Sequence, residues 1–315
     1  MGDTFWGLSL TDSDILFWDE EGGLLLSYSK ENLMTIKKNG LETKLVEAVL
    51  SKLGIEGLSL STDLEGLKTV YGAWCRKVPF DNIQKLIHLE SGNQAPLPGD
   101  DPVDFFEGWL RFGTGGTCWA GSNALYSLLL SLGFKVHRAT GTMLIAPGAP
   151  PNHGSVIVNC GGELFLADTS ILHGAPIKID DNLSTKIEHP AWGIDGYPEK
   201  GNWYVRWRPF HMLDGCTCCI GDTNASHNTF MELNEKTRKW GPFNYSLYFR
   251  INQGDTVTGV SFGDRFSFDS RGNIKRTAMS PEAHYFFLSQ EMGISKEILD
   301  KLPVDKPTPP SPGSK

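Results

Sequence analysis

The chain has 315 residues, a net charge of −8 and a hydrophobic content of 40%, so it is long enough to bury a sizeable core. Nucleic-acid affinity comes mainly from basic side chains that neutralise phosphates, and an acidic chain without a Lys/Arg cluster excludes a nucleic-acid partner. The longest apolar run, residues 124–134, is about half as long as a bilayer crossing requires, which argues against a membrane partner. The N-terminus lacks a secretory signal, and we therefore expect a cytoplasmic location.

The first third of the chain is predicted to be helical after a short extension. Residues 1–32 mix aromatic and acidic side chains without a clear period, and this N-terminal extension is either an extra strand pair or a packed arm. Residues 33–134 have helical apolar spacing and end in a helix that is apolar on nearly all sides, with Gly133 as its C-terminal cap. This helical region carries the candidate nucleophile described below.

Strand patterns dominate the remainder of the chain. Residues 135–215 are rich in β-branched and alternating side chains divided by Gly and Pro, which predicts an antiparallel β-barrel. Residues 216–300 are predicted to form an α/β lid region, with further strands expected over 229–271 and a final helix over 281–299. The Pro-rich tail, 301–315, is predicted to be disordered. The expected fold class is therefore α+β, with helices first and strands afterwards.

The pattern around Cys118 is typical of a nucleophilic cysteine. Cys118 follows Gly115 and Gly116 and opens the buried helix, where unpaired backbone N–H groups and the helix dipole favour an anion. A thiolate is the competent nucleophile, and backbone N–H groups at this position are able to hold an oxyanion. A single cysteine at a helix start is more often a small core residue, so this pattern needs support from elsewhere in the chain.

That support comes from a predicted hairpin. His153 heads one strand and Asp168 ends the next, with Gly161 and Gly162 as the turn between them. A two-residue turn places Asp168 opposite Ser155, diagonal to His153 and on the same face of the sheet, and a four-residue loop pairs His153 with Asp168 directly. Only a three-residue loop separates the two residues. A carboxylate there orients the imidazole while the second ring nitrogen faces the cysteine. The sequence therefore predicts a catalytic triad of Cys118, His153 and Asp168.

A second cluster contains residue types that bind metal ions, but its spacing is not typical of a metal site. Cys216, Cys218 and Cys219 lie near His211 and His227 in the sequence. The Cys-x-Cys-Cys spacing lacks the usual two-residue gap and a second cysteine pair. We therefore predict no metal ion, and six cysteines in a chain of this length do not indicate a disulfide framework.

Several segments resemble the arylamine N-acetyltransferases. Residues 76–82 (RKVPFDN) resemble the Pro-Phe-Glu-Asn stretch of that family, and residues 115–134 resemble its Gly-Gly-aromatic-Cys helix. The segments NHGSVIV and LFLAD resemble its His and Asp strands. APIKI (175–179) and WGPFN (240–244) resemble its Pro-Leu and Ser-Pro-Phe stretches.

This resemblance covers roughly residues 33 to 270 and implies a helical region, a β-barrel and an α/β lid. It also implies acetyl-CoA as the acyl-donor substrate and a small-molecule amine as the acceptor. Cys118, His153 and Asp168 each match the motif position of a triad residue. The alternating aromatics Trp203, Trp207 and Phe210 are candidates for an acceptor pocket or for the core, and Arg206 and Arg208 are candidates for CoA phosphate contacts or for solvated residues.

Three positions depart from the family pattern. Thr114 stands where the family has Arg, Ala120 where it has an acidic residue or Gln, and Ser122 where it has Asn. These departures leave the acyl-chain preference and the identity of the acceptor open, and the oligomeric state is open as well.

Two other functions remain as alternatives. The Asp168-Thr169-Ser170 sequence also resembles the Asp-Pro-Thr strand end of transglutaminase-like cysteine enzymes, which implies a hydrolase or an amide-forming enzyme. A non-catalytic binding protein that keeps the fold is the third possibility.

Overall fold

The computed structural model describes residues 40–145, 148–188 and 193–310, together with the backbone of three N-terminal strands. These strands are β1 (Gly7–Leu10), β2 (Asp14–Trp18) and β3 (Leu24–Ser29), and they form an antiparallel sheet in the order β1-β2-β3. The extension predicted over residues 1–32 thus contains three strands, and its remaining residues lie outside the described part of the chain, as do residues 33–39.

The described part of the helical region, residues 40–134, contains five helices, with one short strand among them. They are α2 (Thr43–Leu53), α3 (Leu64–Lys77), α4 (Ile83–Glu90), α5 (Pro102–Phe112) and α6 (Cys118–Ser131). The strand β4 (Phe80–Asp81) separates α3 from α4, because Pro79 cannot continue the helix. Helix α6 is buried along most of its length, in agreement with its all-round apolar pattern, and Gly133 follows it with a left-handed φ of 87°.

An eight-stranded antiparallel sheet follows α6. Its strands are β5 (Lys135–Met143), β6 (His153–Cys160), β7 (Glu163–Leu166), β8 (Ile177–Ile179), β9 (Thr185–Ile187), β10 (Ile194–Glu199), β11 (Asn202–Trp207) and β12 (Cys216–Ile220). Their order is β8-β7-β6-β5-β12-β11-β10-β9, and the edge strands β8 and β9 contact each other. The sheet is therefore a nearly closed barrel, and β12 extends it past residue 215.

A third unit contains a five-stranded sheet with helices. Its elements are α7 (His227–Lys236), the short helix η1 (Pro242–Asn244), β13 (Tyr248–Gln253), β14 (Thr256–Ser261), β15 (Asp264–Phe268), β16 (Ile274–Ala278), α8 (Pro281–Phe286), η2 (Phe287–Glu291) and α9 (Lys296–Leu299). The sheet order is β16-β15-β14-β13-β4, so the strand from the helical region completes it.

Two local expectations for this unit were wrong. Residues 229–236 belong to α7 and not to a strand, because the Ser226 side chain accepts the Thr229 N–H and caps a helix there. The single helix expected over residues 281–299 is divided, and Gly293 adopts a left-handed φ of 73° at the break.

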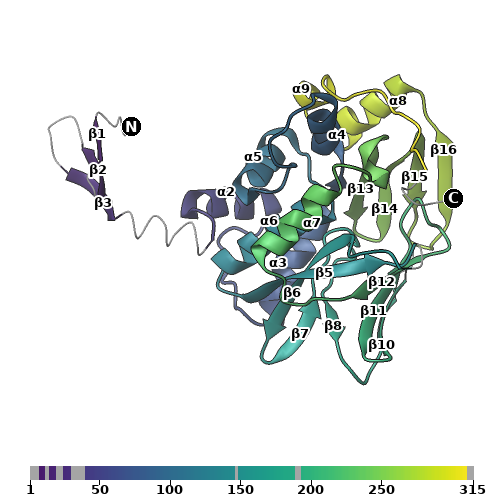
Figure 1. Cartoon of the computed structure of the whole chain (residues 1–315), viewed down its shortest axis with the longest axis horizontal. Coiled ribbons are helices and arrows are strands. Elements are labelled where there is room, and N and C mark those ends of the chain that lie inside the picture. Colours follow the sequence, from purple (N-terminus) through teal and green to yellow (C-terminus); the bar gives the residue numbers. More distant parts are fainter. Residues whose placement is uncertain are drawn as a thin grey trace.

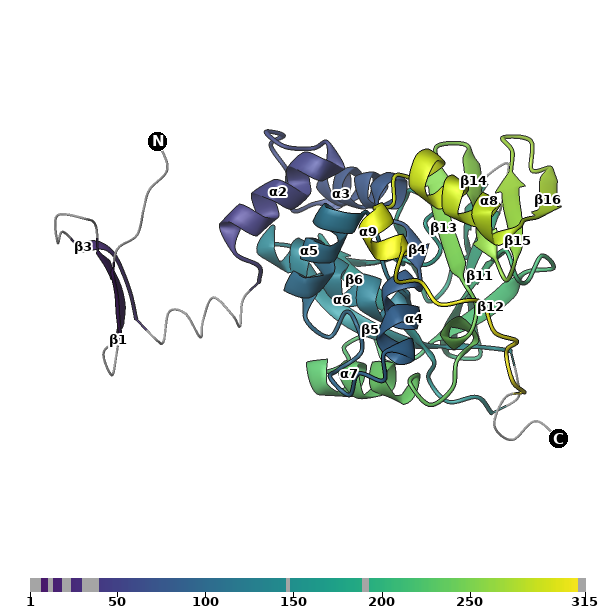
Figure 2. The same cartoon turned by 90° about the horizontal axis from the view of Figure 1, so that it is seen from above.

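The three units meet around α6. Figure 1 shows the helical region and the C-terminal sheet above the barrel strands, with α7 crossing in front of α6. Seen from above, α8 lies over the C-terminal sheet, and α9 lies between that sheet and α5 (Figure 2). One continuous apolar core includes residues of α3, α5, α6, the barrel and β13 to β15. No helix within the described residues is both long and apolar enough to cross a membrane.

The C-terminal tail is described as far as residue 310. Lys306 donates its backbone N–H to the Tyr245 carbonyl at 2.8 Å, and the Trp240 indole donates to the Pro309 carbonyl at 3.1 Å. These contacts hold that part of the predicted tail along the segment before β13. Residues 311–315 lie outside the described residues.

Candidate active site

Cys118 is the first residue of α6 and is 8% exposed. The residue before it, Thr117, makes no side-chain hydrogen bond to the helix start, so side chains leave the first-turn N–H groups uncapped. These donors and the positive end of the helix dipole lie beside the sulfur. The position is therefore suited to hold negative charge, either on the thiolate or on an oxygen that develops charge during a reaction.

The two glycines before Cys118 are required by close packing. A Cβ on Gly115 would lie 1.8 Å from the Pro79 carbonyl oxygen, and one on Gly116 would lie 2.8 Å from the Ala120 Cβ. A bridge between Gly116 and Phe80 ties this loop to β4. The loop that presents the cysteine is thus pressed against β4 and the first turn of α6.

The β6–β7 hairpin brings His153 and Asp168 together. Cys160 pairs with Glu163, so Gly161 and Gly162 form the two-residue turn and the register places Asp168 opposite Ser155. His153 Nε2 and Asp168 Oδ2 are 2.6 Å apart, and both side chains are buried. The structure therefore contains the diagonal pair that the turn length predicts.

Asp168 is held as an anion. Its second carboxylate oxygen accepts hydrogen bonds from the Ser170 N–H at 2.9 Å, the Ser170 hydroxyl at 2.6 Å and the Ile171 N–H at 3.1 Å. Burial raises the pKa of Asp168, but the charge and hydrogen bond of His153 and the bonds from Ser170 outweigh it and hold the pKa well below its usual range. The carboxylate is therefore charged at neutral pH.

His153 interacts with both Asp168 and Cys118. Burial lowers the pKa of His153, but the negative charges of Asp168 and Cys118, together with hydrogen bonds to both, raise it to about 10. Because Nε2 is bonded to Asp168, Nδ1 is the ring nitrogen that remains for Cys118. The three residues predicted to form the site thus lie in contact as cysteine, imidazole and carboxylate.

A surrounding layer of hydrogen bonds fixes the hairpin against the helices. The Tyr71 hydroxyl donates to the Asp168 backbone carbonyl at 2.6 Å, and the Ser122 hydroxyl donates to the Gly154 carbonyl at 3.0 Å. Ser122 is one of the departures from the family pattern, and here its hydroxyl joins α6 to the strand of His153. No sequence feature pointed to the role of Tyr71.

Asp81 is a second buried carboxylate beside the nucleophile loop. Its side chain is fully buried and accepts the Gly115 N–H at 2.5 Å and the Ile83 N–H at 3.0 Å. Burial raises the pKa of Asp81 to about 7, although both hydrogen bonds act in the opposite direction. Thr114 is buried close by and accepts a bond from Gln84 at 2.8 Å. The sequence marked this segment by its resemblance but assigned Asp81 no role.

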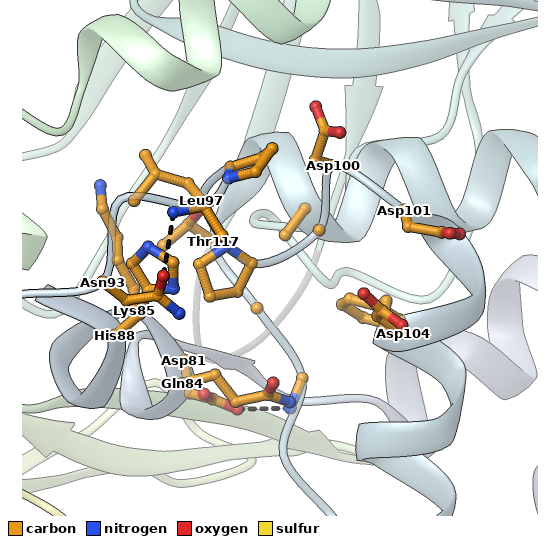
Figure 3. Close-up of a pocket in the computed structure, with 18 residues that line it drawn as sticks. Asp81, Gln84, Lys85, His88, Asn93, Leu97, Asp100, Asp101, Asp104 and Thr117 are labelled. Carbon is orange, nitrogen blue, oxygen red and sulfur yellow. Dashed lines mark hydrogen bonds between the residues drawn. The ribbon is translucent and has the colours of Figure 1, made fainter. Parts of the chain in front are cut away.

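A cavity of about 410 Å³ lies beside the same loop, and Asp81 is one of the residues that line it (Figure 3). Its walls include Gly115, Gly116, Thr117 and Ala120, which adjoin Cys118 in the sequence. The close-up shows Asp100, Asp101 and Asp104 on one side and Lys85, His88 and Asn93 on the other. Sequence reasoning missed this cavity, because three separate segments of the chain form it.

The remaining predicted candidates lie in other environments. Cys216 and Cys218 are buried, Cys219 alternates with them on β12, and no group of three potential metal-ligating side chains occurs in the described ranges. Trp203 and Trp207 are buried in the barrel, and the Trp207 ring centroid is 5.9 Å from that of His153.

Phe210 packs in the core against Phe266 and Phe268, so it does not line the site. Arg206 bonds the Asp214 carbonyl at 2.5 Å on the outer face of the barrel.

Comparisons with known proteins bear on the fold and on the candidate site. Residues 63–185, which contain all three candidate triad residues, match a family model described as N-acetyltransferase. No curated protein matches the chain closely enough in sequence to be counted as a relative.

Three solved structures illustrate the structural similarity. The arylamine N-acetyltransferase from Salmonella typhimurium is 17% identical with a TM-score of 0.67, and the match covers 81% of this chain and 92% of that one. The Mycobacterium marinum enzyme in complex with CoA is 13% identical with a TM-score of 0.68, covering 81% and 94%. The Bacillus cereus enzyme, described as having a unique Cys-His-Glu catalytic triad, is 19% identical with a TM-score of 0.64, covering 81% and 100%.

These matches confirm the α+β fold that the sequence predicted, with N-terminal helices, a nearly closed eight-stranded barrel and a C-terminal sheet with helices. The chain thus matches the N-acetyltransferase family model over residues 63–185, and over most of its length its fold is similar to that of the arylamine N-acetyltransferases, the family that its motifs resemble.

Proposed function

We propose that this protein transfers an acetyl group, or another acyl group, from CoA to an aromatic amine or a related nucleophile through a thioester on Cys118. The observation that carries the proposal is the buried His153–Asp168 pair, 2.6 Å apart, in contact with a cysteine at an uncapped helix start. The Mycobacterium marinum homologue binds CoA, which supports CoA as the carrier of the acyl group.

The first half-reaction follows from the charge state of the site. With a pKa of about 10, His153 is an imidazolium at neutral pH, and its positive charge favours attack by Cys118 as a thiolate. The thiolate attacks the thioester carbonyl, and N–H groups of the first turn of α6 hold the oxyanion. The bond between the carbonyl carbon and the CoA sulfur then breaks, and His153 donates its proton to the departing thiolate.

The second half-reaction reverses these roles. The acceptor amine attacks the acyl carbonyl on Cys118, and neutral His153 removes the proton that the amine loses. The carbon–sulfur bond breaks and restores the Cys118 thiolate, while the proton on His153 restores the ion pair. Asp168 holds the imidazole in one orientation throughout and stabilises its positive charge.

Intact-mass spectrometry with acetyl-CoA tests this function. Before any acceptor is added, Cys118 should gain a single acetyl group and free CoA should appear, and an arylamine should then remove the label. Because Thr114 and Ala120 replace the usual residues beside the nucleophile, propionyl-CoA and butyryl-CoA are tested in parallel. If no thioester labels Cys118 while iodoacetamide does, the proposal fails. Labelling by a carboxamide with release of ammonia would favour the transglutaminase-like alternative.

A further inference from the structure

The loop that follows Asp168 contains a residue in a conformation that side chains rarely adopt. Leu172 has a left-handed φ of 54° and is completely buried. In this region the Cβ of a bulky residue crowds the neighbouring backbone, so the conformation persists only where surrounding contacts hold it. Residues in such conformations cluster at functional sites. Leu172 lies in the same loop as the carboxylate that contacts His153, so the contacts that hold Leu172 also bear on the triad.

Tyr71 of α3 contacts both ends of this loop. Its hydroxyl donates to the Asp168 carbonyl at 2.6 Å, and the Nδ1 atom of His173 lies 3.4 Å from the same hydroxyl oxygen. The His173 ring also packs edge-on against the Tyr71 ring, with centroids 5.7 Å apart. Residues 168 and 173 reach one hydroxyl because the chain reverses between them, and the left-handed Leu172 lies in that reversal.

The helices α3 and α6 confine the ends of the loop. The Ser122 and Thr169 hydroxyl oxygens are 3.1 Å apart, and a Cβ on Gly121 would lie 2.9 Å from the Thr169 hydroxyl oxygen. At the other end, a Cβ on Gly72 would lie 3.2 Å from the Gly174 carbonyl oxygen. The packing of the two helices thus fixes where the loop begins and ends, and its reversal depends on a further contact.

Asn252 of β13 supplies that contact. Its side-chain amide donates to the Leu172 carbonyl at 2.6 Å, across 80 residues of sequence, and the residue is 3% exposed. Its Oδ1 accepts no hydrogen bond from any described residue. A buried amide that uses one of its two polar groups adds little net free energy of folding, because its desolvation offsets the bond. The main contribution of Asn252 is therefore to fix the peptide group of the left-handed residue.

We propose that Asn252 is a positioning residue, which holds Leu172 in its left-handed conformation and thereby keeps the Asp168 carboxylate aligned with His153. The C-terminal sheet carries none of the three triad residues, and through Asn252 it contributes to their geometry. For its kinetic consequences the inference rests on the acyl transfer proposed above, because the alignment of His153 matters there for both proton transfers.

Kinetics of two Asn252 variants test the proposal with acetyl-CoA and 4-methylaniline. In Asn252→Ala and the volume-conserving Asn252→Leu, kcat should fall about 10- to 100-fold with little change in KM, because a small displacement of a reacting group slows chemistry without weakening substrate binding. Thr258→Val is the matched control. Thr258 is a buried polar residue of the adjacent strand β14, and its hydroxyl donates to the Phe266 carbonyl within the sheet, so kcat should stay unchanged.

The left-handed residue allows a rescue experiment. Glycine adopts a positive φ without strain, whereas alanine removes most of the same side chain and keeps the crowded Cβ. Leu172→Gly should therefore restore most of the rate lost in Asn252→Ala, and Leu172→Ala in the same background should not. If Asn252 only stabilised the fold, both second substitutions would lower the rate further, since both leave a cavity at residue 172.

Alkylation of Cys118 separates this inference from the proposed function. The rate of its reaction with iodoacetamide at pH 7 depends on the thiolate, which the His153–Asp168 pair favours, and needs no CoA thioester. This rate should fall in Asn252→Ala and recover with Leu172→Gly. If no CoA thioester acylates Cys118 but the alkylation rates follow this pattern, the proposed function fails and the positioning role stands. Normal kcat and alkylation in both Asn252 variants, or a loss that Leu172→Gly does not recover, would overturn the positioning role.

Discussion

At the scale of single side chains, the proposed chemistry depends on one sulfur atom, so Cys118→Ala should abolish turnover. The folded state should lose little stability, since the side chain is small and its removal leaves only a small void. Acylation by acetyl-CoA and thermal unfolding check the two parts. Cys160→Ala is the control, because Cys160 lies at the far end of β6 from His153, and this variant should stay active. Activity in Cys118→Ala would contradict the mechanism.

Asp168→Asn removes the charge that holds His153 protonated and oriented. We expect kcat to fall by about three to four orders of magnitude, as in other triads whose carboxylate is replaced by an amide. The pKa of His153 should also move down from about 10, since the charge of Asp168 is a main cause of its elevation. NMR titration of the imidazole measures this shift. An unchanged histidine pKa with normal kcat would show that the pair is structural.

Asp81 is expected to act through the nucleophile loop. Its carboxylate accepts the Gly115 N–H, and Asp81→Asn can present one acceptor oxygen in place of two. We expect a roughly tenfold loss of kcat with little change in KM, because the first turn of α6 then holds the oxyanion less well. Asp81→Glu, which matches the family residue at this position, should recover part of the rate. Equal losses in kcat for both variants would contradict this role.

At the scale of elements, the β6 strand lies so close to α6 and α7 that one of its residues has to be glycine. A Cβ on Gly154 would lie 2.7 Å from the rings of both Trp119 and Phe230. We therefore expect Gly154→Ala to lower the free energy of unfolding by about 1–3 kcal/mol and to displace the adjacent His153. Gly193→Ala is the control, since a Cβ there meets nothing within 4 Å. Urea unfolding of both variants measures the difference.

At the scale of the whole molecule, three buried acidic and basic groups make stability depend on pH. The depressed pKa of Asp168 contributes stability that is present above its unfolded pKa of about 4 and is lost as the pH falls. The raised pKa of His153 contributes stability as well. This contribution is fully present below about pH 6.5, the unfolded pKa of histidine, and is lost as the pH rises through about 10.

Asp81 has the opposite sign to Asp168. Its folded pKa of about 7 lies above the unfolded value, so its contribution is largest below about pH 4 and is lost as the pH rises through 7, by at most about 4 kcal/mol. We expect the unfolding free energy of Asp81→Asn to vary less between pH 4 and 7 than that of the unmodified protein. Urea titrations at several pH values check this, and identical pH profiles would contradict it.

The sequence by itself determined the order of the elements and the register of one hairpin. Helical spacing with Gly133 as a cap predicted the helices, because these signals are local to each segment. The Gly161-Gly162 turn predicted that Asp168 lies beside His153, either diagonal to it or directly paired with it, and the structure has the two-residue turn that makes the pair diagonal. The motifs in residues 76–82 and 115–134, which resemble those of the arylamine N-acetyltransferases, indicated the fold because they too can be read within one segment of the sequence.

Tertiary structure alone decided which distant groups surround the nucleophile. Tyr71, Asp81 and Asn252 meet the nucleophile loop and the loop after the hairpin through contacts that span from 34 to 97 residues of sequence. Such contacts follow from how three units pack, and no local period or motif encodes the burial that raises the pKa of Asp81 or the bond from Asn252 to the Leu172 carbonyl. The same packing decided that residues 229–236 form a helix over α6, where the sequence had been expected to form strands.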